Sequence, residues 1–139
     1  MVTIRIALDS DIDDVYELAR VFATSFAVEK EAFKHSYIQL LNSPEAYFAV
    51  AEVQAKVEGY VLGFDHYTFY ANGRVGWVEE IMVSEHVRRQ GIGEQLIRKF
   101  EAWAVERGSR LVALATRRAA SFYQAIGYEE SATYFRRKF

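Results

Sequence analysis

The residues with the clearest capacity for chemistry are two arginines and two glycines, Arg88, Arg89, Gly91 and Gly93, which separate an apolar run from a long amphipathic pattern. A glycine-rich turn that opens a helix presents several unpaired backbone N–H groups in one direction, with the positive end of the helix dipole behind them. Such a turn can bind a phosphate or pyrophosphate, and glycine lets the ligand approach the backbone closely. The stretch therefore predicts an anion site.

Two common phosphate motifs are excluded at this turn. A dinucleotide-binding fingerprint would continue to a third glycine, but that position is Leu96. A P-loop would place a Lys-Ser or Lys-Thr pair after its last glycine, and here Glu94 and Gln95 follow.

Composition limits the function classes. A chain of 139 residues with 51% hydrophobic residues is long enough for one folded domain with a real core, which we expect to span residues 1–139. A net charge of −2 gives no electrostatic footprint for nucleic acid. No apolar run reaches the length of a membrane span, and the N-terminal residues do not resemble a signal peptide, so we expect a cytoplasmic protein without membrane contact. The absence of cysteine excludes thiolate metal sites and a cysteine nucleophile, and the isolated histidines predict no bound metal.

Periodicity and turn residues predict the elements that position the turn. Apolar spacing predicts helices over 12–22, 28–41, 92–104 and 118–126. Strand-like runs cover 2–8, 46–52, 57–67, 75–83, 111–116, 128–130 and 133–139. Asn72-Gly73 predicts a hairpin, and the helix before 111–116 allows that strand to lie parallel to its predecessor. The fold class is therefore α/β (α+β), a mixed and mostly antiparallel sheet.

The order of three motifs resembles the GCN5-related N-acetyltransferase (GNAT) family over essentially the whole chain. The motifs are Arg88-x-x-Gly91-x-Gly93, the preceding run 79–83, and Ala119-x-x-Phe122-Tyr123-x-x-x-Gly127-Tyr128. The resemblance implies a central sheet of six to seven strands with helices on both faces, splayed between the fourth and fifth strands. It implies an acetyl-CoA-dependent N-acetyltransferase that moves an acetyl group to a primary amine by direct attack in a ternary complex.

The resemblance also assigns roles to residues. Backbone groups of the turn (Arg88, Arg89, Gln90, Gly91, Ile92, Gly93, Glu94) would hold the pyrophosphate of acetyl-CoA, and those of Ile81, Met82 and Val83 would pair with its pantetheine arm. Tyr123 would lie against the cofactor and act as general acid for the departing thiolate. Glu79 and Glu80 are both possible bases, with a slight preference for Glu79. Adjacent strand residues point to opposite faces, so only one should face the acceptor unless a bulge re-aims the other.

Other readings stay open. Thr116 stands where relatives often carry asparagine, so its hydroxyl would replace only part of that residue's bonding to the cofactor. Phe26, Phe33 and Tyr37 either line an acceptor pocket or simply pack in the core. His86 either touches the cofactor or is an exposed loop histidine. The acceptor is expected to be a small-molecule amine, and a homodimer is compatible with the sequence. The alternatives to an enzyme are a non-catalytic acyl-CoA-binding or sensing module on the same fold and a generic nucleotide-binding domain.

Overall fold

The structure, a computed structural model, describes residues 1–139. Its strands are β1 (Val2–Ile6), β2 (Ala46–Val53), β3 (Lys56–Thr68), β4 (Gly73–Val83) and β5 (Ser109–Leu114). Its α-helices are α1 (Ile12–Phe22), α2 (Lys30–Leu41), α3 (Ile92–Glu106) and α4 (Ala120–Ala125). Two 3-10 turns, η1 (Asp9–Asp11) and η2 (Glu85–Val87), precede α1 and follow β4.

The five strands form one sheet in the order β1-β2-β3-β4-β5. The first four are joined by antiparallel pairing, whereas β4 and β5 are parallel and α3 connects them. The mixed, mostly antiparallel sheet is thus confirmed, but the expected count of six to seven strands is wrong. Segments 128–130 and 133–139 form no strand, because a strand needs a hydrogen-bonded neighbour and these segments pair with none.

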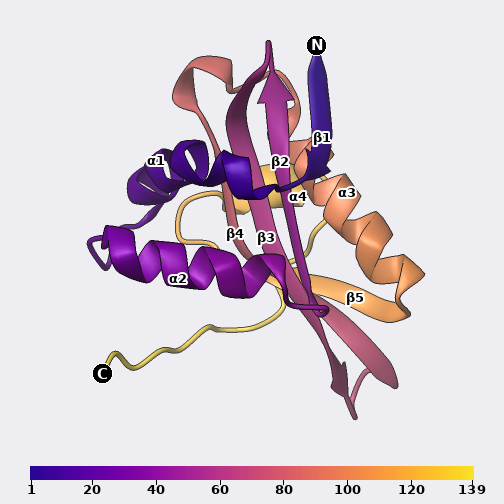
Figure 1. Cartoon of the computed structure of the whole chain (residues 1–139). Coiled ribbons are helices and arrows are strands. Elements are labelled where there is room, and N and C mark those ends of the chain that lie inside the picture. Colours follow the sequence, from indigo (N-terminus) through magenta and orange to yellow (C-terminus); the bar gives the residue numbers. More distant parts are fainter.

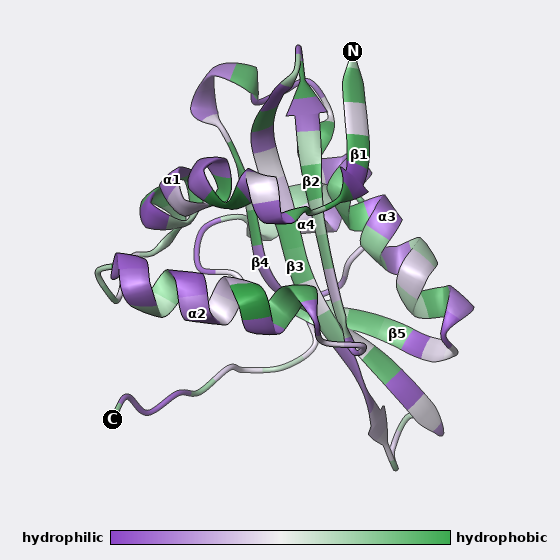
Figure 2. Cartoon of the chain, in the orientation of Figure 1, coloured by the Kyte–Doolittle hydropathy of each residue, from purple (hydrophilic) through white to green (hydrophobic).

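The helices cover both faces of the sheet, with α1 and α2 across one face and α3 and α4 on the other (Figure 1). A buried cluster lies on each side. The α1/α2 cluster centres on Val15, Leu18, Tyr37, Val50 and Tyr60. The α3/α4 cluster contains Val61, Val78, Leu96, Ile97, Phe100 and Tyr123, among others. Figure 2 shows the matching pattern in sequence, since the middle of β3 is apolar and α3 alternates between apolar and polar residues.

Two hairpins build the antiparallel part of the sheet. Gln54 and Ala55 both adopt positive φ (51° and 64°) between β2 and β3. Asn72 (φ 61°) precedes the start of β4 at Gly73, which confirms the predicted Asn-Gly hairpin. None of the helices combines the length and apolarity that a membrane crossing requires.

The sheet opens between its last two strands. Strand β5 pairs with β4 only along Arg74–Val78, where Val78 lies opposite Leu114 at the end of β5. Strand β4 continues for five more residues, to Val83. The edge of β4 over 79–83 therefore faces no strand on the β5 side, which is the expected splay between the fourth and fifth strands.

Candidate functional site

The turn between η2 and α3 contains a row of backbone donors. The first helical hydrogen bond of α3 runs from the N–H of Gln95 to the carbonyl of Gly91 (3.0 Å). None of the N–H groups over 89–94 donates to a protein carbonyl or side chain. Six consecutive donors at the positive end of a 15-residue helix fit a pyrophosphate group.

The two positions of the turn require glycine for different structural reasons. Gly91 has φ +79°, a left-handed conformation that disfavours any residue with a Cβ, and a Cβ there would meet no atom within 4 Å. The space above Gly91 is thus open to a ligand. At Gly93 a Cβ would lie 3.4 Å from the Phe122 ring, so this glycine permits the approach of α4.

Arg88 connects the turn to the end of β4, because its Nε donates to the carbonyl of Val83 at 3.0 Å. This hydrogen bond occupies one of the main-chain acceptors at the end of the open β4 edge. Arg89 takes the left-handed conformation (φ +67°), and its exposed side chain forms no ion pair. Both guanidinium groups therefore lie at the surface around the donors.

The open edge of β4 combines buried side chains with available main-chain groups. Ile81 and Val83 pack against the α3/α4 cluster, while Met82 packs against the α1/α2 cluster. Their N–H and C=O groups on the β5 side have no strand to pair with. An extended ligand with amide groups can pair with such an edge.

A β-bulge decides the orientation of the two glutamates. Leu62 of β3 lies opposite Glu80 and Gly63 lies opposite Val78, so Glu79 is an extra residue in β4. Without the bulge, strand alternation would turn Glu80 toward the α3 face together with Val78. With the bulge, Glu80 turns to the α1/α2 face and Glu79 is left exposed.

Glu80 is partly buried and hydrogen-bonded. The hydroxyl of Tyr60, which is 2% exposed, donates to Oε1 of Glu80 at 2.7 Å. Burial and the neighbouring charge of Glu79 raise the pKa of Glu80, while the Tyr60 hydrogen bond acts in the opposite direction. A carboxylate with a raised pKa accepts a proton more readily than an exposed one, so Glu80 has the properties of a general base.

Tyr123 lies on the other face of the sheet, within the α3/α4 cluster. Its ring contacts Phe122 and Tyr128 edge to face, with centroid distances of 5.0 and 5.8 Å. Its hydroxyl forms no hydrogen bond with the protein, and burial raises the pKa of the phenol. The phenol is therefore protonated at neutral pH and free to donate.

Two polar contacts between α3 and the end of α4 fix the helix that carries Tyr123. Arg98 donates to the carbonyl of Ile126 at 2.8 Å, and the Tyr128 hydroxyl donates to Glu101 at 2.7 Å. At the start of α4, Oγ1 of Thr116 accepts the N–H of Ala119 at 3.1 Å. The Thr116 hydroxyl thus stabilises the beginning of α4, and its proton and second lone pair remain for another partner.

Among the aromatics of the N-terminal region, core packing is confirmed for Tyr37, which is 2% exposed and donates to the carbonyl of Leu8 at 2.6 Å. Phe33 packs against the same cluster, whereas Phe26 is exposed. No group of three or more His, Asp or Glu side chains is arranged to hold a metal ion.

Two features of the site were missed in the sequence. Tyr60 reads as one more apolar residue of β3, and its contact with Glu80 depends on a bulge that no pattern predicts. For His86 the sequence offers either a contact with the cofactor or an exposed loop position. Its side chain is 67% exposed, but its Nε2 lies 2.8 Å from Oε2 of buried Glu58, a contact that the sequence does not predict. Burial alone would raise the pKa of Glu58, but its interactions with Ser84 and His86 outweigh that effect and lower it.

A cavity of about 310 Å³ lies beside this pair, between α1 and the end of β4. It is lined by Glu17, Leu18, Val21, Met82, Ser84, Glu85, His86 and Arg88. A shallower groove of about 600 Å³ runs along the outer face of α3 from Gly91 to Ala102. The donor turn therefore borders open space on both sides.

Comparisons with known proteins match this geometry. Residues 12–128 match the model of the acetyltransferase (GNAT) family. An uncharacterized N-acetyltransferase of Methanocaldococcus jannaschii is 32% identical over 137 residues, which cover 92% of this chain and 61% of that protein. This chain thus spans less than two thirds of that relative's length. The aminoalkylphosphonate N-acetyltransferase of Salmonella typhimurium is 29% identical over 92% of this chain and 85% of that protein.

A solved structure shares the fold. The aminoglycoside N-acetyltransferase AAC(6')-Iy, crystallised in complex with CoA, superposes with a TM-score of 0.87 over 99% of this chain and 95% of that chain. The sequence identity is 21%, so this likeness concerns the fold alone.

Proposed function

The chain belongs to the GNAT family of acetyltransferases, and from that membership we propose that it transfers the acetyl group of acetyl-CoA to a primary amine. The observation that carries the proposal is the row of unpaired N–H groups over 89–94 beside the open edge of β4. One feature fits a pyrophosphate and the other fits a chain of amides, and CoA contains both in that order.

The fit of the donor can be followed along the site. The N–H groups of the turn bind the pyrophosphate, with Arg88 and Arg89 adding charge at its rim. The N–H and C=O of Ile81 and the N–H of Val83 pair with the pantetheine arm along the open edge, because the main-chain groups of Met82 face β3. When bound, acetyl-CoA supplies an activated acetyl group as a thioester. Residues of this chain then remove the proton of the amine and protonate the departing thiolate.

The acceptor must reach the thioester as a free amine. An ammonium group with a pKa near 10.4 is mostly protonated at pH 7, and removing its proton costs about 4 to 5 kcal/mol. Glu80 takes this proton, directly or through a water molecule, because it is half-buried, has a raised pKa and is oriented by Tyr60. Glu79 is exposed and has no hydrogen-bonding partner, so we assign it no more than a surface role.

The departing thiolate needs a proton donor on the opposite side. Tyr123 provides one, since its hydroxyl is free and its pKa is raised. Acid and base therefore approach β4 from opposite faces, Tyr123 from the α3 face and Glu80 from the α1/α2 face. With no cysteine available for an acetyl-cysteine stage, the amine attacks the thioester directly in a ternary complex. Catalysis then comes mainly from positioning.

We assign the acceptor to small-molecule amines. The Salmonella typhimurium relative is named for acting on aminoalkylphosphonates, which are small amines.

An amine panel assayed by release of the CoA thiol tests the proposal. Turnover of at least one small amine, with CoA rather than ATP or NAD competing for the donor site, is the expected result. Tight CoA binding without turnover of any amine in the panel would instead favour the acyl-CoA sensor. Tighter binding of ATP or NAD than of CoA would refute the donor assignment.

A further inference from the structure

A short segment sets the distance between the two parts of the cofactor site. This connector, which we define as residues 84–88, contains η2 and joins the open edge of β4 to the N–H groups over 89–94. A ligand that contacts both parts binds tightly only if they are already held in one arrangement, because ordering a loop on binding costs affinity. The support of the connector therefore bears on how tightly acetyl-CoA binds.

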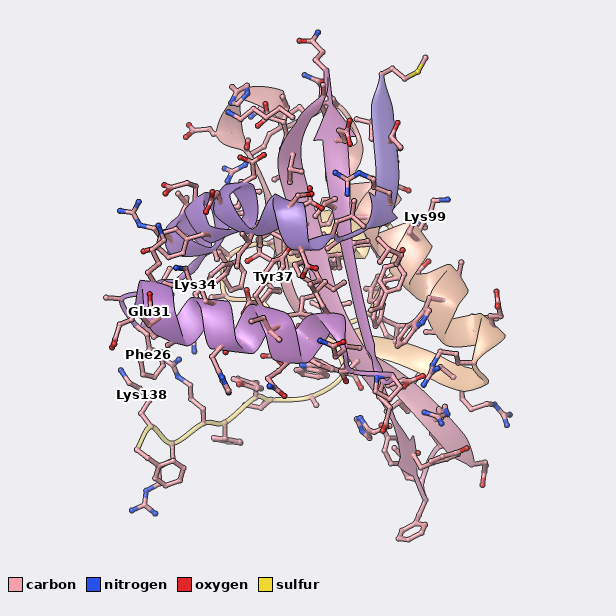
Figure 3. The ribbon with its side chains drawn as sticks, in the orientation of Figure 1. Phe26, Glu31, Lys34, Tyr37, Lys99 and Lys138 are labelled. Carbon is pink, nitrogen blue, oxygen red and sulfur yellow. The ribbon has the colours of Figure 1, made fainter.

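The connector is poorly packed on the side of α1. All of its residues except Val87 line the cavity of about 310 Å³ beside that helix. Elsewhere the α1/α2 face is filled with side chains, such as that of Tyr37, which Figure 3 shows between α1 and α2. Val87 is the one buried residue of the connector and packs into the α3/α4 cluster. Polar contacts must therefore hold the rest of the segment.

Glu58 of β3 supplies these contacts. Val57 and Gly59 lie opposite consecutive residues of β2, so Glu58 is an extra residue in a β-bulge. Its carbonyl accepts the N–H of Ser84 at 2.7 Å, and its carboxylate lies 2.8 Å from Nε2 of His86. Burial raises the pKa of Glu58, but the hydrogen bonds from Ser84 and His86 outweigh burial and lower the pKa. The carboxylate is therefore charged at neutral pH.

Packing alone does not account for a charged carboxylate at this position. The Glu58 side chain is 8% exposed. A buried ion pair is often no more stable than an apolar side chain of similar volume. A β-bulge re-aims a side chain, and bulges are frequent next to functional sites. What a glutamate adds here is the link between β3 and the connector.

We propose that Glu58 is a positioning residue of the cofactor site, whose carboxylate fixes the connector and thereby holds the donor turn and the open edge of β4 in the arrangement that binds acetyl-CoA. It rests on the proposed use of acetyl-CoA. Neither Glu80 nor Tyr123 forms a hydrogen bond with Glu58, so its contribution belongs to binding rather than to the chemical step. A negative charge by itself would repel the phosphates. Positioning and repulsion therefore predict changes of opposite sign when the charge is removed.

The test compares two donors with one amine of the panel. One is acetyl-CoA and the other is S-acetylpantetheine, which lacks the pyrophosphate and the adenosine. Glu58→Leu removes the carboxylate and introduces an apolar side chain of similar size. We expect the KM for acetyl-CoA and the calorimetric Kd for CoA to rise about tenfold, with little change in kcat at saturation. The KM for S-acetylpantetheine should change much less, because this donor does not span the connector.

Two kinds of variant serve as controls. Asp11→Asn alters another buried carboxylate, which pairs with Arg5 and accepts the N–H of Leu8 rather than holding the connector. It should lower stability without changing the ratio of the two KM values. His86→Gln keeps an N–H donor and should bind CoA nearly as wild type does, whereas His86→Leu should weaken binding. Because His86 is exposed, its variants decide the question even if Glu58→Leu does not fold.

Three results would overturn the proposal. CoA affinity equal to wild type in His86→Leu and in folded Glu58→Leu would show that the connector needs no such support. Tighter CoA binding in Glu58→Leu would show that the charge acts by repulsion. An equal rise of KM for both donors would indicate a general loss of structure. A wild-type chain that binds no CoA would instead refute the proposed function, and this inference with it.

Discussion

The substitution Tyr60→Phe offers the sharpest test of the catalytic arrangement. It removes one hydroxyl, whose oxygen lies 2.7 Å from Glu80, and keeps a ring that fills the α1/α2 cluster. That hydroxyl lowers the pKa of Glu80, against the effects of burial and of Glu79, which raise it. Without the hydroxyl, the pKa of Glu80 must therefore rise, and the carboxylate becomes protonated at a higher pH.

The size of this effect follows from the hydrogen bond. A hydrogen bond to a charged group contributes about 1.5 to 3 kcal/mol, and about 1.4 kcal/mol corresponds to one pH unit. We expect the acidic limb of the kcat profile to move up by about one to two pH units. On that limb, kcat should fall by about ten- to a hundredfold, while the plateau at high pH should change little.

The assay is CoA-thiol release with one amine of the panel, measured across the pH range for wild type and variant. Using the same amine in both cancels the contribution of its own protonation. Tyr37→Phe is the matched control, because it removes another buried hydroxyl with a short hydrogen bond (2.6 Å) in the same cluster but leaves Glu80 untouched. It should lower stability by about 1 kcal/mol without moving the limb.

Two results would refute the reasoning. An acidic limb that stays in place in Tyr60→Phe, with turnover intact, would show that Glu80 is not the titrating base. A limb that moves to lower pH would contradict the sign of the Tyr60 contribution.

Three other predictions address separate parts of the molecule. Tyr123→Phe should lower kcat by about a hundredfold. The control Tyr128→Phe loses only its hydrogen bond to a glutamate of α3 and should leave kcat unchanged. Equal decreases of kcat in both variants would point to helix packing instead of acid catalysis. Gly91→Ala forces a Cβ into a left-handed conformation at a cost of about 1 to 2 kcal/mol. Calorimetry should therefore show CoA binding weakened about tenfold. An unchanged affinity would contradict the role of the turn in binding CoA. Asp65→Ala removes a fully buried carboxylate that pairs with Arg74 and Arg107. Urea unfolding should show that the free energy of unfolding falls by about 3 to 5 kcal/mol. A decrease below about 1 kcal/mol would be evidence against a structural ion pair.

Most of the fold can be predicted from local sequence patterns. Asn72-Gly73 predicted the β3–β4 hairpin, and Pro44 predicted the end of α2 near Leu41. The stripe from Ile92 to Ala104 predicted α3, because helix periodicity is a local signal. The proposed anion site at Gly91 and Gly93 rests on the same kind of local reasoning.

Long-range pairing could not be read in this way. The strand count failed at residues 133–139, whose composition favours a strand but whose pairing partner is not encoded locally. The orientation of Glu80 depends on one extra residue in β4, and a bulge of this kind leaves no mark in the apolar alternation. Alternation alone leaves both glutamates open, with a slight preference for Glu79, and the contact between Tyr60 and Glu80 joins residues twenty positions apart.

The central claim is that an amine loses its proton to Glu80 and attacks bound acetyl-CoA. The most direct measurement compares CoA-thiol release by Glu80→Gln and Glu79→Gln, two isosteric changes at neighbouring positions, with the same amine at pH 7. The account predicts that Glu80→Gln loses about 10² to 10⁴ in kcat and that Glu79→Gln stays near wild type. Full activity in Glu80→Gln, or the larger loss in Glu79→Gln, would contradict it.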